Sequence, residues 1–189
     1  MSGSRPVLLV MDFQHGIVER LGASGAPPVL EAAGRAVGAA RGRGIPVLFV
    51  RVAFRAGFPE ITATNARFNA LRQAGGAPVE DQPAAQIHTA LAPAPDEPVI
   101  TKRRVSAFSG SDLDVLLRAT AADTLVLAGI STSGVVLSTV RQAADLDYRL
   151  VVLADACADP DPQVHSLLTE KVFPPQALVT AVDEWARTG

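Results

Sequence analysis

Cysteine is almost missing from this sequence, and charge of one sign does not gather anywhere in it. Cys157 is the only cysteine among 189 residues, which excludes a disulfide bond within the chain and a metal site built from several cysteines, and is typical of a reducing compartment. The formal net charge is −2, and no block of like charges occurs. We therefore expect neither nucleic acid nor an anionic membrane as a partner.

Long hydrophobic runs are also missing. The longest stretch without a charged residue, 124–140, is interrupted by Ser, Thr and Gly, and no apolar segment with a cleavage site follows Met1. A membrane-spanning helix needs about 20 consecutive apolar residues, and a secretory signal needs an apolar core near the N-terminus. We therefore expect a cytoplasmic protein that is neither exported nor inserted in a membrane.

Short apolar runs alternate with helical patterns along the chain. Apolar residues make up 48% of the sequence, enough for one domain over residues 1–189 with a full-sized core. The runs predict strands at 6–11, 47–52, 99–101, 125–128, 150–153 and 177–182. Helical spacing predicts helices at 29–43, 112–120, 161–172 and after Gly129. The alternation predicts a single-domain α/β fold, with a Rossmann-like, six-stranded, mostly parallel sheet and helices on both faces.

Residues 54–96 interrupt this alternation. The segment is rich in proline and glycine and contains only short apolar runs, such as Ile87 to Leu91. A long excursion of this kind is usually a loop that covers a substrate or a segment of an interface. We predict one of these two roles for it, rather than a second domain.

The stretch 125–148 joins a buried strand to a helix through a turn rich in hydroxyl groups. We expect Gly129 to end the strand and Thr132 or Ser133 to cap the helix. The apolar face of this helix is predicted from four residues near the 3.6-residue period, Val136, Val140, Ala143 and Ala144. Its N-terminus then opens at the carboxyl edge of the sheet, where free N–H groups favour an anion or a developing oxyanion.

Two further charged residues end predicted strands. Asp12 follows the strand at 6–11, and Lys102 follows the strand at 99–101. The carboxyl ends of parallel strands meet at one edge of a sheet, so these side chains are expected to cluster with the turn after Gly129. A carboxylate beside an ammonium group keeps both charged, while partial burial tunes either toward proton transfer. The sequence therefore predicts an acid/base pair at this edge.

Three fragments in this order resemble the isochorismatase-like, or cysteine hydrolase, superfamily. They are LLVMDFQ at 8–14, ITKRRVSAF at 100–108 and GISTSGVVLSTVRQA at 129–143, and LADAC follows at 153–157. The resemblance implies a six-stranded parallel sheet and a catalytic Asp–Lys–Cys triad. Asp12 and Lys102 match the first two members. The position of the family cysteine, six residues after Gly129, is occupied by Val135.

This departure limits the mechanism that the resemblance implies. In the amidase branches a thiolate attacks a carbonyl group, and Val135 can form no such covalent intermediate. The isochorismatase branch also lacks the cysteine, usually has glycine there, and cleaves a vinyl ether by general acid chemistry with its aspartate; Gly134 lies one residue early for that match. The metal ligands of nicotinamidases, Asp-x-His after the second strand, are absent because 51–55 reads RVAFR. We expect no metal and no other cofactor.

Three hypotheses for function remain open. The first is a hydrolase of a small metabolite, with Asp12 as general acid or base, Lys102 as its electrostatic partner, and the N–H groups around Ser133 to Val135 stabilising an anion. The second is a catalytically inactive homologue that binds a small molecule. The third is an amidase that uses a serine of the 131–133 turn as nucleophile.

Several other residues are candidates for substrate contacts. The turn residues Ser131, Thr132, Ser133 and Gly134 either bind substrate and form an oxyanion site or simply shape the turn. His15 either lines the pocket beside Asp12 or lies on the surface. Arg51, like Arg55, either holds a substrate carboxylate or is solvated.

Two expectations concern Cys157 and assembly. Cys157 lies in the LADAC motif, which also occurs in relatives that keep the usual cysteine, so we predict a structural role for it. Members of the superfamily are commonly dimers or tetramers, and the apolar, proline-rich excursion at 54–96 offers surface for an interface. We therefore expect a homodimer or homotetramer.

Overall fold

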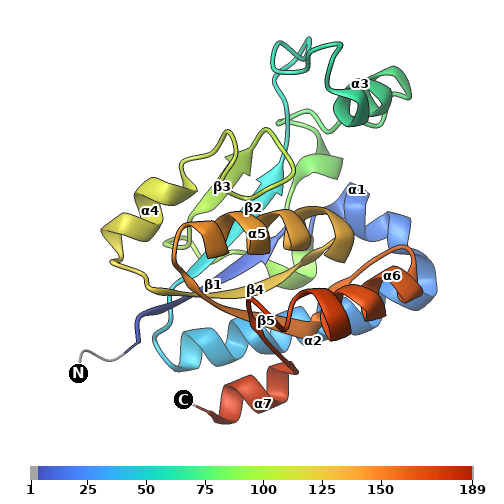
Figure 1. The fold of residues 1–189 in the computed structure, drawn as a ribbon. Coiled ribbons are helices and arrows are strands. Elements are labelled where there is room, and N and C mark those ends of the chain that lie inside the picture. Colours follow the sequence, from blue (N-terminus) through green and yellow to red (C-terminus); the bar gives the residue numbers. More distant parts are fainter. Residues whose placement is uncertain (1–3, 189) are drawn as a thin grey trace.

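The computed structural model describes residues 4–188 and contains one six-stranded parallel sheet (Figure 1). The expected domain, 1–189, also includes 1–3 and 189, which lie outside the described residues. The strand order is β3-β2-β1-β4-β5-β6. The strands are β1 Pro6–Met11, β2 Val47–Val52, β3 Val99–Lys102, β4 Thr124–Ile130, β5 Arg149–Ala158 and β6 Leu178–Thr180. The predicted α/β class and Rossmann-like parallel sheet are confirmed.

Seven helices accompany the sheet in the described part of the chain. They are α1 His15–Val18, α2 Gly22–Gly42, α3 Ala66–Gln73, α4 Leu113–Ala119, α5 Leu137–Asp145, α6 Pro162–Leu167 and α7 Val182–Arg187. Short 3₁₀ turns occur at Glu19–Leu21, Pro83–Ala85 and Thr89–Leu91, and π-helical turns at Thr132–Val136 and Leu168–Val172. No helix among residues 4–188 is long and apolar enough to cross a membrane.

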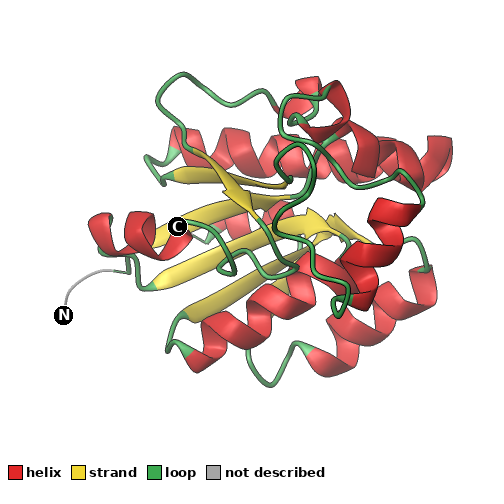
Figure 2. Ribbon diagram, turned by 90° about the horizontal axis from the view of Figure 1, so that it is seen from above, coloured by secondary structure: helices red, strands yellow, loops and turns green. Residues whose placement is uncertain are grey.

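Helices cover both faces of the sheet, as predicted (Figure 2). Val7, Leu9 and Met11 of β1 belong to a core cluster with buried residues of α4, α5 and the segment that follows α6. Leu8 and Val10 belong to a second cluster with α2 and α7. Because successive side chains of a strand alternate between the faces, a strand buried on both faces is a continuous apolar run. This explains why β1 shows no polar alternation.

The helix after β4 presents the predicted apolar face. Val136, Val140 and Ala143 are fully buried, and Ala144 packs against the same cluster. The strand before it runs on to Ile130, so the prediction that Gly129 ends the strand is wrong. Gly129 pairs with neighbouring strands, and a Cβ atom on it would lie 3.0 Å from Val136 Cγ2 and 3.2 Å from Met11 Cβ. The glycine therefore serves close packing inside the strand.

Other predicted boundaries need correction. Helix α2 begins seven residues before the expected start at 29 and passes through Pro27 and Pro28. Strand β5 is longer than the expected 150–153 and includes LADAC. The expected strand at 177–182 stops at Thr180, because the Asp155 carboxylate accepts a hydrogen bond from the Val182 N–H group at 2.8 Å and α7 begins there.

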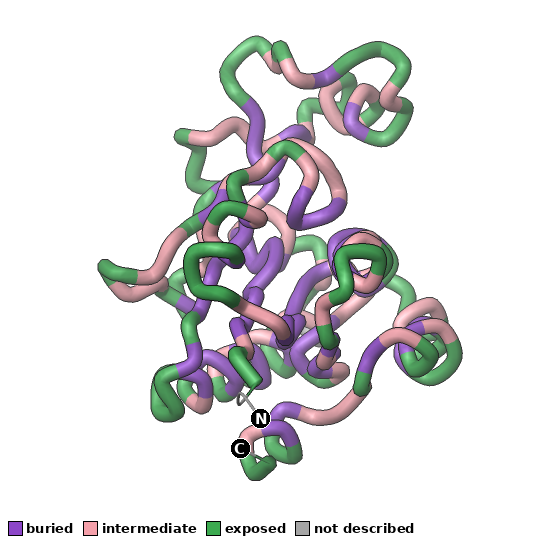
Figure 3. The backbone as a smooth tube through the Cα atoms, turned by 60° about the vertical axis from the view of Figure 1, so that its left-hand side comes forward, coloured by how far each residue is buried: buried purple, intermediate pink, exposed green. Residues whose placement is uncertain are grey.

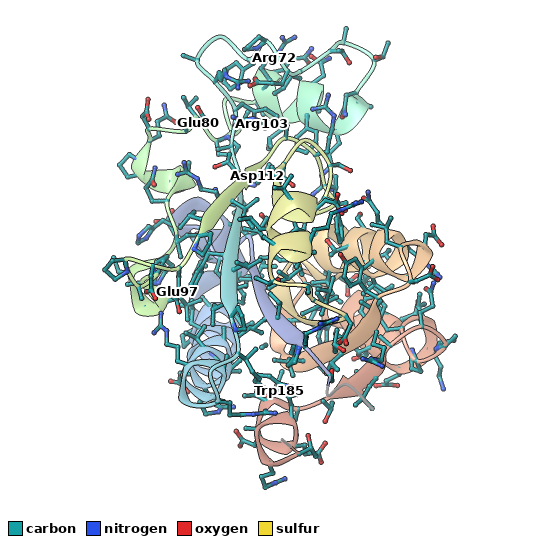
Figure 4. The ribbon with its side chains drawn as sticks, turned by 90° about the vertical axis from the view of Figure 1, so that its left-hand side faces the viewer. Arg72, Glu80, Glu97, Arg103, Asp112 and Trp185 are labelled. Atoms are coloured by element: carbon teal, nitrogen blue, oxygen red, sulfur yellow. The ribbon has the colours of Figure 1, made fainter. Side chains whose placement is uncertain are left out.

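The excursion at 54–96 forms its own small apolar cluster beyond the end of the sheet. Phe54, Ile61 and Phe68 are buried in it. Figure 3 shows that much of the rest of this segment is exposed. Arg103, in the segment after β3, forms ion pairs with Glu80 and Glu60, and Figure 4 shows Arg103 and Glu80 close together. These contacts attach the excursion to the carboxyl end of the sheet.

Substitution of Gly129 tests the close packing of β4. The added methyl group of Gly129→Ala has no free space, so we expect a loss of roughly 1–3 kcal/mol in the free energy of unfolding, measured by chemical denaturation. The matched control is Gly38→Ala in α2, where a Cβ atom meets nothing within 4 Å. There we expect a gain of roughly 0.5–1 kcal/mol, since alanine favours the helix. Equal stability of Gly129→Ala and the unchanged protein would contradict this account.

Candidate active site

A cavity of about 540 Å³ lies at the carboxyl edge of the sheet, where the chain order reverses between β1 and β4. Ligands of open α/β sheets bind at this switch point. Asp12 follows β1, Lys102 ends β3, and Ser131 and Val135 come from the turn after β4. All four line the cavity. Residues that are far apart in the sequence thus share one site.

Asp12 and Lys102 form a buried ion pair in this cavity. Lys102 Nζ lies 2.8 Å from Asp12 Oδ2 and also donates a hydrogen bond to the Arg104 carbonyl oxygen at 3.0 Å. Only 5% of Asp12 and 1% of Lys102 is exposed. Burial raises the pKa of Asp12 above its ordinary value, although the Lys102 ammonium group opposes the shift. Asp12 Oδ1 is itself buried and accepts no hydrogen bond among the described residues, and a buried acceptor without a partner is a feature that calls for a functional explanation.

The backbone of Asp12 has an unusual conformation. Its φ angle is +61°, in the left-handed region, which costs roughly 1–2 kcal/mol for most residues and is best tolerated by glycine, asparagine and aspartate. The Asp12 N–H group still donates to the Val50 carbonyl oxygen at 2.8 Å. The chain thus turns sharply at the end of β1 while staying attached to β2. Strained residues of this kind gather at functional sites.

The turn after β4 is not capped as predicted. Ser131 precedes the helix, so the expectation of Thr132 or Ser133 as cap is wrong. Thr132 is fully buried, with its hydroxyl 2.8 Å from His165 Nδ1. The Ser133 N–H group donates to Asp159 Oδ2 at 2.7 Å. A carboxylate from another loop therefore takes the place at the helix start that we expected a ligand to occupy.

Two of the three N–H groups that we expected to hold an anion, those of residues 133–135, already have hydrogen-bond acceptors within the protein. Besides Ser133, the Gly134 N–H group is also occupied, since it donates to the Ser131 carbonyl oxygen at 3.1 Å. Of the hydroxyl residues in the turn, only Ser131 lines the cavity; Ser133 is exposed. The cavity therefore meets this turn through the side chains of Ser131 and Val135.

His15 and Arg51 do not line the cavity, contrary to the expected substrate contacts. The His15 ring packs against His88 at a tilt of 38°, with centroids 4.7 Å apart, and it lines a second pocket. Arg51 donates hydrogen bonds to Thr101 Oγ1 at 3.0 Å and to Gln86 Oε1 at 2.8 Å. Both side chains thus contact residues of the segments around the cavity rather than the cavity itself. Arg55 likewise pairs with a residue of the excursion, Glu60.

Sequence reasoning missed two arginines that do line the cavity. Arg20 lies in the 3₁₀ turn after α1, and Arg67 lies in α3 of the excursion. Arg20 donates to the Gly76 carbonyl oxygen at 3.3 Å. The proline-rich composition of 54–96 indicated a segment over the site. Nothing in the sequence distinguished Arg67 from the other arginines of that segment.

Cys157 and Val135 occupy different environments. Cys157 pairs with Gly129 in the sheet, is 5% exposed and does not line the cavity. Burial raises the pKa of its thiol to about 12, so it is hardly ever a thiolate at neutral pH. Val135 is 2% exposed and lines the cavity together with Asp12 and Lys102. Among residues 4–188 no three His, Cys, Asp or Glu side chains gather as metal ligands would.

Thiol labelling tests these two environments. We expect iodoacetamide to leave the native protein unmodified, because Cys157 is buried and protonated, and to add one label after denaturation. Both positions are buried, but residue 135 lines the cavity and Cys157 does not, so Val135→Cys should take a label in the native state faster than Cys157. Intact-mass spectrometry after a fixed reaction time reads out both. Rapid native labelling of Cys157 would contradict the buried, protonated thiol.

Comparisons with known protein sequences all indicate the same family. The model of a family described as Isochorismatase domain matches residues 6–184. The chain is 34% identical over 192 residues to the uncharacterized isochorismatase family protein YecD of Escherichia coli O157:H7, covering 97% of this chain and 96% of that protein. It is 34% identical over 175 residues to ureidoacrylate amidohydrolase RutB of Methylobacterium radiotolerans, covering 82% of this chain and 68% of that protein.

Solved structures share the fold. An isochorismatase family protein from Desulfovibrio vulgaris has a TM-score of 0.85 at 28% identity, with 97% of both chains covered. N-carbamoylsarcosine amidase from Thermoplasma acidophilum has a TM-score of 0.78 at 27% identity, covering 95% of this chain and 97% of that one. The resemblance and the fold expected from it are confirmed, and the chain belongs to the isochorismatase family of hydrolases.

Proposed function

We propose that this protein hydrolyses a small metabolite by acid/base chemistry at Asp12 and Lys102, without a cysteine nucleophile. The observation that carries the proposal is the Asp12 carboxylate at the cavity wall. One of its oxygens pairs with Lys102 at 2.8 Å, and the other has no hydrogen-bond partner among the described residues. A carboxyl group with one unpartnered oxygen and a raised pKa suits a general base.

The proposed reaction uses Asp12 in two steps. Asp12 Oδ1 takes a proton from water while the water oxygen forms a bond to the electrophilic carbon of the substrate. The protonated carboxyl group then gives this proton to the leaving nitrogen or oxygen as its bond to that carbon breaks. One water is consumed and Asp12 returns to its ionised form. The Lys102 side chain beside Asp12 favours the carboxylate form between turnovers.

Two observations support attack by water rather than by an enzyme nucleophile. Val135, at the position that the resemblance assigns to the cysteine, lines the cavity with an apolar side chain. The Ser131 hydroxyl lines it too, but among residues 4–188 it makes no hydrogen bond to a basic side chain that would activate it. Thr132 has His165 beside it but is fully buried.

The names of two relatives indicate which class of bond to test first. RutB is named as an amidohydrolase and the Thermoplasma protein as an amidase, so a C–N bond is the first class of substrate to test. An ether bond is the second, because general acid chemistry at an aspartate also serves vinyl ethers. The apolar Val135 side chain in the cavity favours one alternative, a homologue that binds a small molecule without turnover.

Replacement of Asp12 tests the acid/base role. We expect Asp12→Asn to abolish turnover of whichever small amide or enol ether the protein cleaves, while ligand affinity stays within about tenfold, or roughly 1.4 kcal/mol. Steady-state kinetics and calorimetric titration measure the two separately. Asp114→Asn, at an exposed ion pair with Arg118, is the control and should keep full activity. Full activity of Asp12→Asn would refute the proposal.

The pH profile tests the role of Lys102. Because burial raises the pKa of Asp12, kcat/KM should fall on the acid side at a pH above the ordinary aspartate value of about 3.9. Lys102→Met removes the cation that favours the carboxylate, so the acid limb should move to higher pH. The control is Lys171→Met, since Lys171 is exposed and outside the cavity. An acid limb that stays in place or moves to lower pH in Lys102→Met would contradict the pairing.

A further inference from the structure

The charged side chains that line the cavity are not all paired. They are Asp12, Glu19, Arg20, Arg67 and Lys102. Asp12 and Lys102 neutralise each other, and Arg20 donates to a backbone carbonyl oxygen. Arg67 makes no hydrogen bond or ion pair with any residue in the described range 4–188. Its guanidinium group is therefore free to bind a ligand.

A second unused donor lies beside Arg67. A Cβ atom placed on Gly134 would lie 3.8 Å from Arg67 Nη2 and 2.6 Å from Ser131 Oγ, so these two groups approach the same point at the start of the turn. The Ser131 hydroxyl makes no hydrogen bond among the described residues. Glycine at 134 leaves this point open, since a larger residue would displace the hydroxyl. A guanidinium group and a hydroxyl group that face one point can both donate to one anionic group.

The charges and the apolar residues that line the cavity indicate which class of ligand it can bind. Its lining has three cationic and two anionic side chains, which favours a single negative charge over two. A guanidinium fork matches the two oxygens of a carboxylate. The remaining wall is largely apolar and includes Ile17, Phe68, Leu71 and Val105. A small organic acid with an apolar body fits these features.

We propose that Arg67, with the Ser131 hydroxyl, binds the carboxylate of a monoanionic substrate and so selects carboxylic acids over neutral analogues. This rests on the proposed function, because the same substrate must place its scissile bond at Asp12. Arg67 is a specificity-determining residue in this assignment, and Ser131 is a hydrogen-bond donor rather than a nucleophile.

Arg67 and the acid/base pair come from different parts of the chain. Helix α3 belongs to the excursion at 54–96, whereas Asp12 and Lys102 belong to the sheet. Burial raises the pKa of Asp12, Lys102 lowers it most among the charges, and Arg67 adds a smaller lowering. Arg67 and the acid/base pair line the same cavity, so one small substrate can contact both.

The matched control lies on the same helix. Arg72 donates to Asn69 Oδ1 at 2.8 Å and does not line the cavity, and Figure 4 labels it on α3. Arg67→Gln and Arg72→Gln remove the same charge from the same helix. Only the first removes it from the cavity, so a difference between them cannot come from net charge alone.

Calorimetric titration with benzoate and its neutral analogue acetophenone, which has no bond that the proposed reaction cleaves, tests the assignment. The two probes have one shape and differ in charge, and neither needs turnover, so loss of catalysis in Asp12→Asn leaves this test intact. We expect the unchanged protein and Arg72→Gln to prefer benzoate by at least about tenfold, or 1.4 kcal/mol. Arg67→Gln should lose that preference with acetophenone binding unchanged. Arg67→Lys should keep part of it, and Ser131→Ala should weaken benzoate severalfold.

Three results would overturn the proposal. They are equal binding of both probes by the unchanged protein, no binding of benzoate at millimolar concentration, and an undiminished preference in Arg67→Gln whose circular dichroism matches that of the unchanged protein. Titration with phenyl phosphate distinguishes a site for a carboxylate from a site for a phosphate. Weaker binding than benzoate supports a carboxylate, and tighter binding through Arg67 would overturn the assignment to a monoanion.

Discussion

The buried ion pair of Asp12 and Lys102 is the constraint on which the rest of the site depends. Both charges have lost nearly all contact with water, so each is tolerable only because the other lies 2.8 Å away. Removal of one partner from such a pair costs roughly 3–5 kcal/mol. The pair therefore needs β1 and β3 held in register through β2, with both side chains directed into one cavity.

The turn after β4 contributes side chains to the site, whereas a helix N-terminus usually contributes free N–H groups. Asp159 accepts from the Ser133 N–H group, and the Ser131 carbonyl oxygen accepts from Gly134. These bonds satisfy donors that otherwise attract an anion. The contribution of the turn to the cavity is thus the side chains of Ser131 and Val135. We infer that Arg67 of the excursion, rather than this turn, recognises the charge of a ligand.

The excursion at 54–96 has a definite physical role. Its apolar cluster around Phe54 and Phe68 holds it together, and the ion pairs of Arg103 attach it beside the end of β3. Arg103 follows Lys102 directly in the chain, so the attachment of the excursion and the position of the buried lysine are coupled. The cavity is consequently walled by the sheet on one side and by the excursion on the other.

The sequence by itself determined the α/β class, the parallel sheet and the placement of Asp12 and Lys102 at one edge, because apolar runs and helical periods are local signals and parallel strands align their ends. It also indicated that Val135 lies where the family has cysteine. Only the tertiary structure decided that Gly129 lies inside a strand, that Asp159 caps the next helix, that His15 and Arg51 lie outside the cavity, and that Arg67 lines it. Each of these depends on contacts between residues far apart in the chain, and composition and periodicity carry no information about such contacts.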